Sequence, residues 1–294
     1  MSQGVFLSVL ASMLFGALYY YSSLLNPLSG EQIFGWRMLL TFPAMTAFLW
    51  LSKDWALVSD VWRRLRTQRQ LLIALPLSSC LLAVQLWLFM WAPLHGKALD
   101  VSLGYFMLPL SMVLIGRFLY GERLSPLQTI AVGLACLGIA HELWRVNSFS
   151  WASLLVCLGY PYYFVLRKKI QTDHLGGLWF DMLLMQPVAI VFAIDLDAQF
   201  VQIYADNPKL YALVPLLGAI SASALIAYIA SSKLLPFGLF GLLGYVEPVL
   251  LVFVALALGE AIAPSQWMTY LPVWAAVLCL VADGWRITRA RSGS

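Results

Sequence analysis

Charged residues are scarce in this chain of 294 residues. Asp, Glu, Lys and Arg make up 11% of it and hydrophobic residues 62%, whereas soluble domains average roughly 25% and roughly 45–50%. This scarcity of charge excludes an ordinary soluble domain. A lipid bilayer is therefore the expected environment of most of the chain.

Cysteine and histidine are also few, and their positions exclude several kinds of site. The four cysteines fall within apolar stretches without CxxC spacing, which indicates buried thiols rather than a zinc site. The three histidines lie on different predicted loops or helix ends. We therefore expect no metal and no cofactor at these residues, which are Cys80, Cys136, Cys157, Cys279, His95, His141 and His174.

The motifs of nucleotide-binding and hydrolytic enzymes are missing. The chain has no GxxxxGK[ST], no GxGxxG after a strand and no GxSxG. An ATP-driven pump is therefore disfavoured, and nothing indicates a nucleic-acid partner. An intramembrane enzyme is disfavoured too, because the apolar stretches hold no paired acid and base and no metal ligands, so no catalytic residue is expected.

What the chain does have is long apolar stretches. Windows of about 20 residues, the length that spans a bilayer as a helix, identify ten of them. No Lys or Arg precedes Arg37, so the first stretch lacks the basic start of a secretory signal and is interpreted as a transmembrane helix. The sequence predicts an all-α integral membrane protein with ten transmembrane helices, at residues 4–25, 32–51, 71–93, 101–120, 126–143, 150–166, 177–194, 210–231, 237–258 and 265–285.

The loops between these stretches are asymmetric in charge. If the N-terminus is cytoplasmic, thirteen Lys and Arg residues lie in cytoplasmic segments and three, Lys97, Arg145 and Lys209, lie outside. Basic residues concentrate in cytoplasmic loops of membrane proteins. Both termini are therefore predicted to be cytoplasmic.

A sequence pattern occurs twice in the chain. Leu-Gly-Tyr, a proline, Gly-Glu and a second proline recur in the same order between 103–145 and 243–286, at offsets of 138 to 141 residues. Two repeats, 1–145 and 146–294, would each contain five helices. Because five is odd, the second repeat enters the membrane from the opposite side, and inverted repeats are typical of secondary transporters with a substrate site near the midplane.

One hydrophilic cytoplasmic segment, 53–70, is long enough to have its own structure. Trp55, Val58, Trp62 and Leu65 recur at helical spacing beside basic residues. The segment is either a short helix on the anionic inner leaflet or a solvated loop.

Several segments resemble a known family. The sequence SLGYFMLPLSMVLIGRFLYGERLSPLQ at 102–128, Arg167-Lys168-Lys169-Ile170, and 31–40 with Arg37 are similar to the RarD branch of the EamA drug/metabolite transporter superfamily. The resemblance covers essentially the whole chain. It implies ten helices in two inverted EamA repeats and an inner-membrane carrier, in most members an exporter of amino acids, metabolites or drugs.

Glu247 departs from that family pattern. Members usually have Tyr-Ile-Gly-Pro where this chain has Tyr245-Val246-Glu247-Pro248. At roughly 15 Å from the cytoplasmic end of its span, Glu247 is expected near mid-helix and mid-bilayer, where a carboxylate costs about 2.5–3.5 kcal/mol or more. It either binds a substrate ammonium or a proton, or it is structural, in an ion pair or bonded to a carbonyl freed by Pro248.

Two further charged residues are candidates. Arg37, shallow enough in the second span to snorkel in part, would suit a substrate carboxylate, and a structural or gating ion pair is the alternative. Asp181, in the seventh span, resembles an acidic position of the family. It either pairs with Arg167 or Lys168, which we favour, or belongs to a proton path.

Aromatic and amide residues complete the candidate site. Tyr105 and Tyr245 occupy equivalent positions in the two repeats, and we expect both near the repeat interface, lining a cavity. Each residue on its own is equally consistent with core packing or an interfacial belt. The remaining members are Tyr160 and Tyr163, which flank Pro161, and Gln85, which lies beside Trp87 and Trp91.

Gly-Glu pairs mark the ends of two spans. Gly121-Glu122 and Gly259-Glu260 each precede a proline that starts the next span, Pro126 and Pro264. Glycine after a helix and proline in a first turn terminate and start helices, so these glutamates are interpreted as structural.

The sequence thus predicts a multi-pass secondary transporter in a bacterial inner membrane. Glu247 for amines and Arg37 for carboxylates suit the export of a small zwitterionic molecule by alternating access, an amino acid or a nicotianamine-like metallophore. Its partners would be this substrate, membrane lipid and, if transport is coupled, protons; otherwise flux would be downhill. The alternatives are broad-specificity drug efflux, or an assembly or sensor protein that transports nothing.

Overall fold

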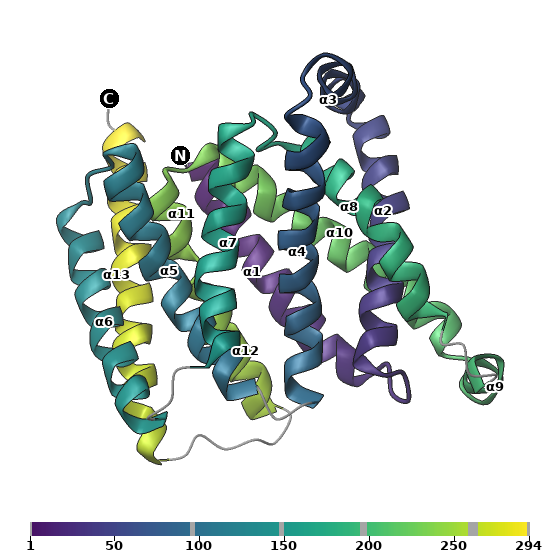
Figure 1. Ribbon diagram of the computed structural model, residues 1–294. Helices are drawn as coiled ribbons and strands as arrows, with labels where there is room; N and C mark the ends of the chain where they lie inside the picture. The colour runs from purple at the N-terminus through teal and green to yellow at the C-terminus, as the bar shows by residue number, and fades with distance from the viewer. Residues whose placement is uncertain (1, 95–97, 147–149, 195–198, 258–263, 293–294) are drawn as a thin grey trace. The chain divides into compact units, whose positions relative to one another are not determined.

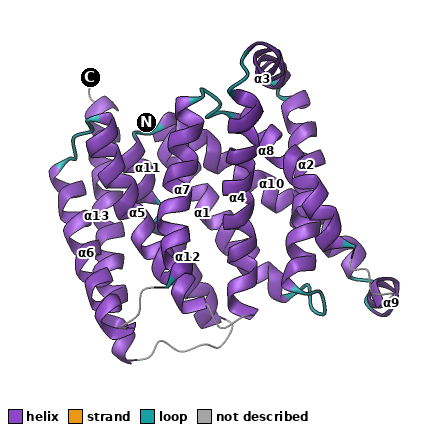
Figure 2. Cartoon of the chain, viewed as in Figure 1, coloured by secondary structure: helices purple, strands orange, loops and turns teal. Residues whose placement is uncertain are grey.

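The computed structural model describes residues 2–94, 98–146, 150–194, 199–257 and 264–292, and these ranges contain helices and no strand (Figure 1, Figure 2). The helices are α1 (Ser2–Ser23), α2 (Gly30–Leu51), α3 (Trp55–Thr67), α4 (Leu71–Leu94), α5 (Ala98–Tyr120), α6 (Pro126–Val146), α7 (Trp151–Lys169), α8 (Leu175–Ala193), α9 (Gln199–Asp206), α10 (Leu210–Leu234), α11 (Phe237–Leu243), α12 (Val246–Ala257) and α13 (Trp267–Ser292), with the 3-10 turn η1 (Pro264–Gln266).

The helices follow the apolar stretches of the sequence. Every predicted span contains a helix, and the span 237–258 is divided into α11 and α12. By length and composition, five helices among the described residues can cross a membrane, in α2, α4, α6, α8 and α10, and four shorter apolar helices accompany them. An all-helical membrane fold is confirmed, while ten crossings and the inversion of the repeats stay predictions.

Helix ends follow local signals. Ser29 caps α2 in a capping box with Gln32, and Ser125 exchanges the same pair of bonds with Gln128 at the start of α6. Gly121 follows α5 with a φ of 64°, the left-handed conformation that glycine adopts at helix ends. Its counterpart, Gly259-Glu260, lies outside the described residues.

The chain divides into two compact units, which are described separately. Unit 1 comprises Met1–Gly16, Leu99–Pro161 and Ala230–Ser294, and unit 2 comprises Ala17–Ala98 and Tyr162–Ile229. Each unit combines helices from both halves of the sequence.

The core of unit 1 joins four segments. Phe106 and Val113 of α5, three residues of α6, the end of α11 with Tyr245, and three residues of α13 form one buried cluster. Helices α6 and α13 lie side by side (Figure 1). A Cβ added to Gly138 would lie 2.8 Å from the carbonyl oxygen of Thr269, so glycine permits this close approach.

Unit 2 is organised around α2 and α8. A Cβ on Gly35 would lie 2.5 Å from the amide nitrogen of Ala193, so the two backbones are in direct contact. Two hydrogen bonds also join α8 to α2. Trp179 Nε1 donates to Thr46 Oγ1 at 2.8 Å, and Gln186 Nε2 donates to the carbonyl of Met38 at 3.3 Å.

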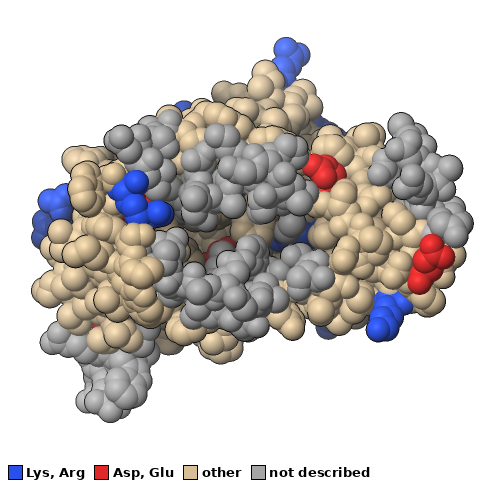
Figure 3. Space-filling view, turned by 90° about the horizontal axis from the view of Figure 1, so that it is seen from below, with Lys and Arg blue, Asp and Glu red and all other residues tan. Residues whose placement is uncertain are grey.

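Both units expose large apolar side chains. Ile73, Phe118 and Trp144 are each more than three-quarters exposed, and most described atoms on the face in Figure 3 belong to neither acidic nor basic residues. Such surfaces are costly in water and favourable against lipid acyl chains. The surface therefore agrees with the composition.

Candidate functional site

The ninth apolar span is interrupted beside Glu247. Helix α11 ends at Leu243, Gly244 and Tyr245 form a turn, and α12 begins at Val246. The Gly244 amide donates to the carbonyl of Gly241 and the Tyr245 amide to that of Leu242, at 2.9 and 3.1 Å. The sequence prediction of an uninterrupted helix here is wrong.

The interruption changes the electrostatic surroundings of Glu247. This half-buried residue lies in the first turn of α12, rather than in mid-helix as expected. The amides of a first turn are partially positive and favour a carboxylate by about 0.3–1 kcal/mol, and by up to about 2 kcal/mol when partly buried. Pro248 has no amide proton, so the carbonyl of Gly244 lacks its donor four residues ahead. A carboxylate and a backbone carbonyl thus belong to one turn, a combination that attracts cations.

Tyr245 ties this turn to α5. Its side chain is fully buried within the core cluster of unit 1, and its hydroxyl donates to the carbonyl of Phe106 at 3.0 Å. In this structure Tyr245 is a packing and hydrogen-bonding residue, and its bond places the turn beside the Tyr105–Phe106 segment.

Helices α5 and α7 bring two of the candidate tyrosines together. The rings of Tyr105 and Tyr160 have centroids 6.2 Å apart. Pro161 deprives the Cys157 carbonyl of its helical donor, and the Ser111 hydroxyl lies 2.6 Å from that oxygen. The carbonyl that Pro161 leaves without a helical donor is thereby bonded by a residue of α5. This bond holds together the helix segments that contain Tyr105 and Tyr160.

In unit 2, Asp181 is at the centre of a buried polar network. Its carboxylate accepts bonds from the hydroxyls of Ser78 and Tyr163, at 2.8 and 2.9 Å, and forms an ion pair with Arg167. Arg167 also donates to the carbonyl of His174 at 2.8 Å and lies over the ring of Tyr163. A buried charge needs such partners. Arg167 is one of the two residues, with Lys168, that the sequence offered for a structural pairing.

The other candidates of unit 2 lie on α2 and α4. Arg37 is buried, and its Nε donates to Ser221 Oγ at 2.9 Å. Gln85 is buried as well. Trp87 is half-buried, with its ring centroid 5.1 Å from that of Trp91.

Several polar residues that bond to the candidate residues or to one another could not be predicted from the sequence. Ser78 and Ser221 are ordinary residues of apolar helices, and their partners are 103 and 184 residues away. In unit 1, the Thr269 hydroxyl donates to Glu142, which pairs with Arg145, and His141 Nδ1 lies 2.9 Å from the same hydroxyl. Of these contacts, only the pair Glu142 and Arg145, three residues apart on one helix, has a spacing that the sequence itself shows.

Glu122 has the structural role that the sequence indicated, but the sequence did not indicate its partner. Its carboxylate accepts the backbone amides of Phe237 and Gly238, at 2.5 and 2.6 Å. These are the first residues of α11, whose own preceding residue, Pro236, provides no side-chain cap. The loop after α5 therefore caps the start of the interrupted span.

Across the part of the chain that the structure describes, no three or more His, Cys, Asp or Glu side chains are grouped so that they could hold an ion.

The chain is similar to known membrane transporters. Residues 2–141 match the EamA-like transporter family. "Chloramphenicol-sensitive protein RarD" of Pseudomonas aeruginosa is 46% identical over 99% of this chain and 97% of its own, and an "Uncharacterized transporter" of Haemophilus influenzae is 39% identical over 97% and 95%. A solved crystal structure shares the fold, with a TM-score of 0.64, 15% identity, and coverage of 98% of this chain and 99% of that one.

Proposed function

Because the chain belongs to the EamA transporter family and to its RarD type, we propose that it exports a small zwitterionic, amino-acid-like metabolite across a bacterial inner membrane. It is a multi-pass membrane transporter and not an enzyme. Amino acids and nicotianamine-like metallophores are the proposed substrate class, and alternating access of two inverted repeats is the proposed mechanism.

The observation that supports this substrate class is the position of Glu247. A carboxylate in the first turn of an interrupted helix has a neighbouring carbonyl without its helical donor. Both groups accept hydrogen bonds, and a substrate ammonium supplies up to three donors. Half-buried Tyr105 and its ring partner Tyr160 provide aromatic surface for the same substrate.

The substrate carboxylate is assigned to Arg37. Its guanidinium is a planar donor set suited to carboxylates, and Ser221 holds its Nε in place. Gln85 and Trp87 are proposed as further contacts. Tyr245, Tyr163 and Asp181 are proposed to position this machinery, since their polar groups bond to the protein itself.

Membrane orientation belongs to the same proposal. Both termini and α3 are assigned to the cytoplasm from the distribution of Lys and Arg. Reporter domains fused after Ser294 or Thr67 should therefore report the cytoplasm, and one fused after Asn207 the outside. A cytoplasmic signal after Asn207 would contradict the inverted repeats as well.

The experiment that tests the substrate class compares metabolites in cells and medium of a deletion strain carrying the wild type or Glu247→Gln. Loss of a buried charge pair costs about 2–5 kcal/mol, so export of the accumulated zwitterion should fall at least about 30-fold with normal membrane insertion. Glu247→Asp should retain partial activity, and Asp54→Asn, at an exposed residue, should leave export unchanged.

A Glu247→Gln protein that exports at the wild-type rate, with the same dependence on external pH, would contradict both the ammonium-binding and the proton-coupling roles of Glu247. Whether energy comes from the proton gradient or from downhill flux is read from that pH dependence.

Broad-specificity efflux is the second candidate, favoured by the name of the Pseudomonas relative, which refers to chloramphenicol. In that case deletion of this chain's gene would change susceptibility to chloramphenicol, and no zwitterionic metabolite would accumulate.

A further inference from the structure

Helix α3 is amphipathic, and one of its faces is fixed to unit 2. Val58 and Val61 are buried and Leu65 is half-buried, and α3 packs against α8. At this contact a Cβ on Gly176 would lie 2.6 Å from the backbone of Leu57. The segment is therefore a docked helix and not a solvated loop.

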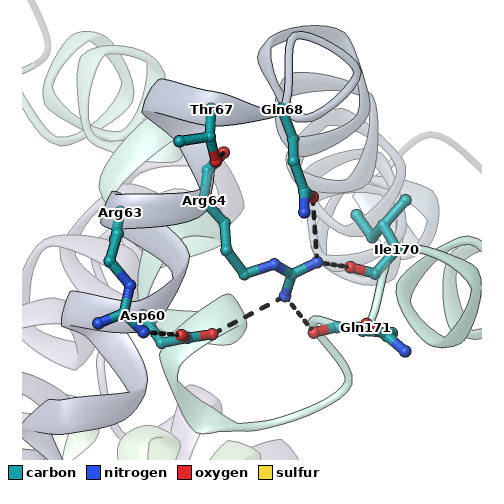
Figure 4. Close-up of polar contacts among 7 residues, drawn as sticks. All are labelled: Asp60, Arg63, Arg64, Thr67, Gln68, Ile170 and Gln171. Carbon is teal, nitrogen blue, oxygen red and sulfur yellow. Dashed lines mark hydrogen bonds and ion pairs between the residues drawn. The ribbon is translucent and has the colours of Figure 1, made fainter.

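Arg64 fastens α3 to the end of α7 (Figure 4). Its Nη1 donates to the carbonyl of Gln171 at 2.9 Å and its Nη2 to that of Ile170 at 2.7 Å. These residues directly follow α7, where the carbonyls at a helix end are partially negative. Arg64 is thus committed to the protein, and the position of α3 is defined by it.

A second face of α3, adjacent to the buried one, combines tryptophan with arginine. Trp55, Ser59, Trp62 and Arg66 are spaced by four, three and four residues, so they form one stripe along the helix. Trp55 and Trp62 remain 38% and 48% exposed although their rings contact Trp179 and Phe180 of α8. This is the composition of helices that lie at the membrane surface.

The two arginines of this outer face are directed away from the protein core. The Arg66 guanidinium lies over the Trp62 ring at 5.6 Å, and no carboxylate among the described residues pairs with it. Arg63 pairs with Asp60, yet its side chain is 77% exposed. Residues 53–70 contain five basic and two acidic residues in total, and exposed Lys169 of α7 adds to the positive charge.

The flanking helices place α3 at the boundary of the membrane. Trp50 and Leu51 at the end of α2 and Leu72 and Ile73 at the start of α4 are all more than half exposed. In a transmembrane protein such apolar side chains face acyl chains. Figure 1 shows α3 end-on, where α2 ends and α4 begins, so α3 lies at the ends of two helices that can each cross a membrane.

We propose that the outer face of α3, formed by Trp55, Trp62, Arg63 and Arg66, is a binding site for the headgroup phosphates of anionic phospholipids. The tryptophans lie among glycerol and upper acyl groups, and the arginines bind phosphate oxygens, which guanidinium groups match in geometry. The site shares no residue with the proposed substrate site. Its test therefore requires no knowledge of what is transported or in which direction.

The test titrates the purified full-length protein, in neutral detergent, with dioctanoyl phosphatidylglycerol or dioctanoyl phosphatidylcholine. Bound lipid is counted by native mass spectrometry. The wild type should bind the anionic lipid at least about fivefold more tightly, and the preference should weaken at high salt because the charges are exposed.

Matched variants locate the site. Arg63→Gln with Arg66→Gln should lose most of this preference, whereas the same exchanges at Arg117 and Arg123, also exposed, should keep it. Arg63→Lys with Arg66→Lys preserves the charge and should retain at least half of the preference. Without lipid, the melting temperature of each pair should match the wild type within about 3 °C, since exposed substitutions rarely affect stability.

Two results would overturn the proposal. One is a wild type that binds both lipids equally, which would make the α3 face a purely solvated surface. The other is an equal loss of preference in the Arg117 and Arg123 control pair, which would trace the effect to net charge.

Discussion

The two copies of the Leu-Gly-Tyr and proline motif have different structures. In α5 the helix continues through Gly104 and Tyr105 and past Pro109. In the second copy it stops at Leu243 and restarts at Val246. Both copies contain the glycine and the proline, five residues apart in the first copy and four in the second, so the presence of these two residue types is not sufficient to interrupt the helix.

The two copies differ in the spacing between glycine and proline, in the residue before the proline and in the surroundings of the glycine. Leu108 precedes Pro109, whereas Glu247 precedes Pro248. Gly104 is pressed against α7, where a Cβ would lie 2.8 Å from the Ser153 carbonyl oxygen. The interrupted copy gives its carboxylate a helix N-terminus, and the continuous copy has no charge to stabilise. The comparison indicates that the interruption and Glu247 belong together.

Placing a carboxylate in the continuous copy tests this directly and should have the largest effect. Leu108→Glu puts the charge inside an unbroken helix, where it costs about 2.5–3.5 kcal/mol. We expect a marked fall in yield and melting temperature in detergent. The neutral Leu108→Gln should be affected less, and a Leu108→Glu protein that melts like the wild type would show that the interruption is not needed for a carboxylate.

Removing the cap of α11 should have an intermediate effect. Glu122→Leu leaves the amides of Phe237 and Gly238 without their acceptor, at a cost of about 1–3 kcal/mol. The melting temperature should fall accordingly, while the control Asp54→Asn, at an N-cap that makes no side-chain bond, should not change it. Equal melting of the two variants would mean that water replaces the carboxylate.

The smallest effect is expected from the hydroxyl of Tyr245. Tyr245→Phe removes the bond to Phe106 and should lower stability by about 1 kcal/mol. Tyr162→Phe, on the exposed side of α7, should be neutral. If both exchanges are neutral, packing alone holds the turn against α5.

Sequence reasoning located most of the helices because hydropathy reports which segments suit a bilayer. For 53–70 the spacing of Trp55, Val58, Trp62 and Leu65 indicated a helix, with a solvated loop as the alternative, and the structure has the helix α3. It failed at Gly244–Tyr245 because the apolar run continues through the turn, and hydropathy does not distinguish one helix from two. Gly244 and Pro248 were visible, but the equivalent residues in α5 do not interrupt that helix.

The partners of the polar residues were the least predictable part of the candidate site. For Asp181 a pairing with Arg167 or Lys168 was predicted because these residues lie near the ends of consecutive spans, and the structure shows the pair with Arg167. For Arg37 the sequence left a substrate carboxylate and a structural ion pair open, and it did not indicate the bond to Ser221, 184 residues away. Such pairs depend on which helices become neighbours, and apolar periodicity does not specify this.

The cap that Glu122 provides has a consequence for the order of assembly. The amides of Phe237 and Gly238 lie 115 and 116 residues after Glu122, whose carboxylate accepts their hydrogen bonds. The acceptor for the start of α11 is therefore synthesised long before α11 itself. Contacts of such long range have to close a long loop, which slows folding. The first turn of α11 depends for this cap on a segment that is synthesised much earlier, and the second half of the chain expressed alone would lack that acceptor.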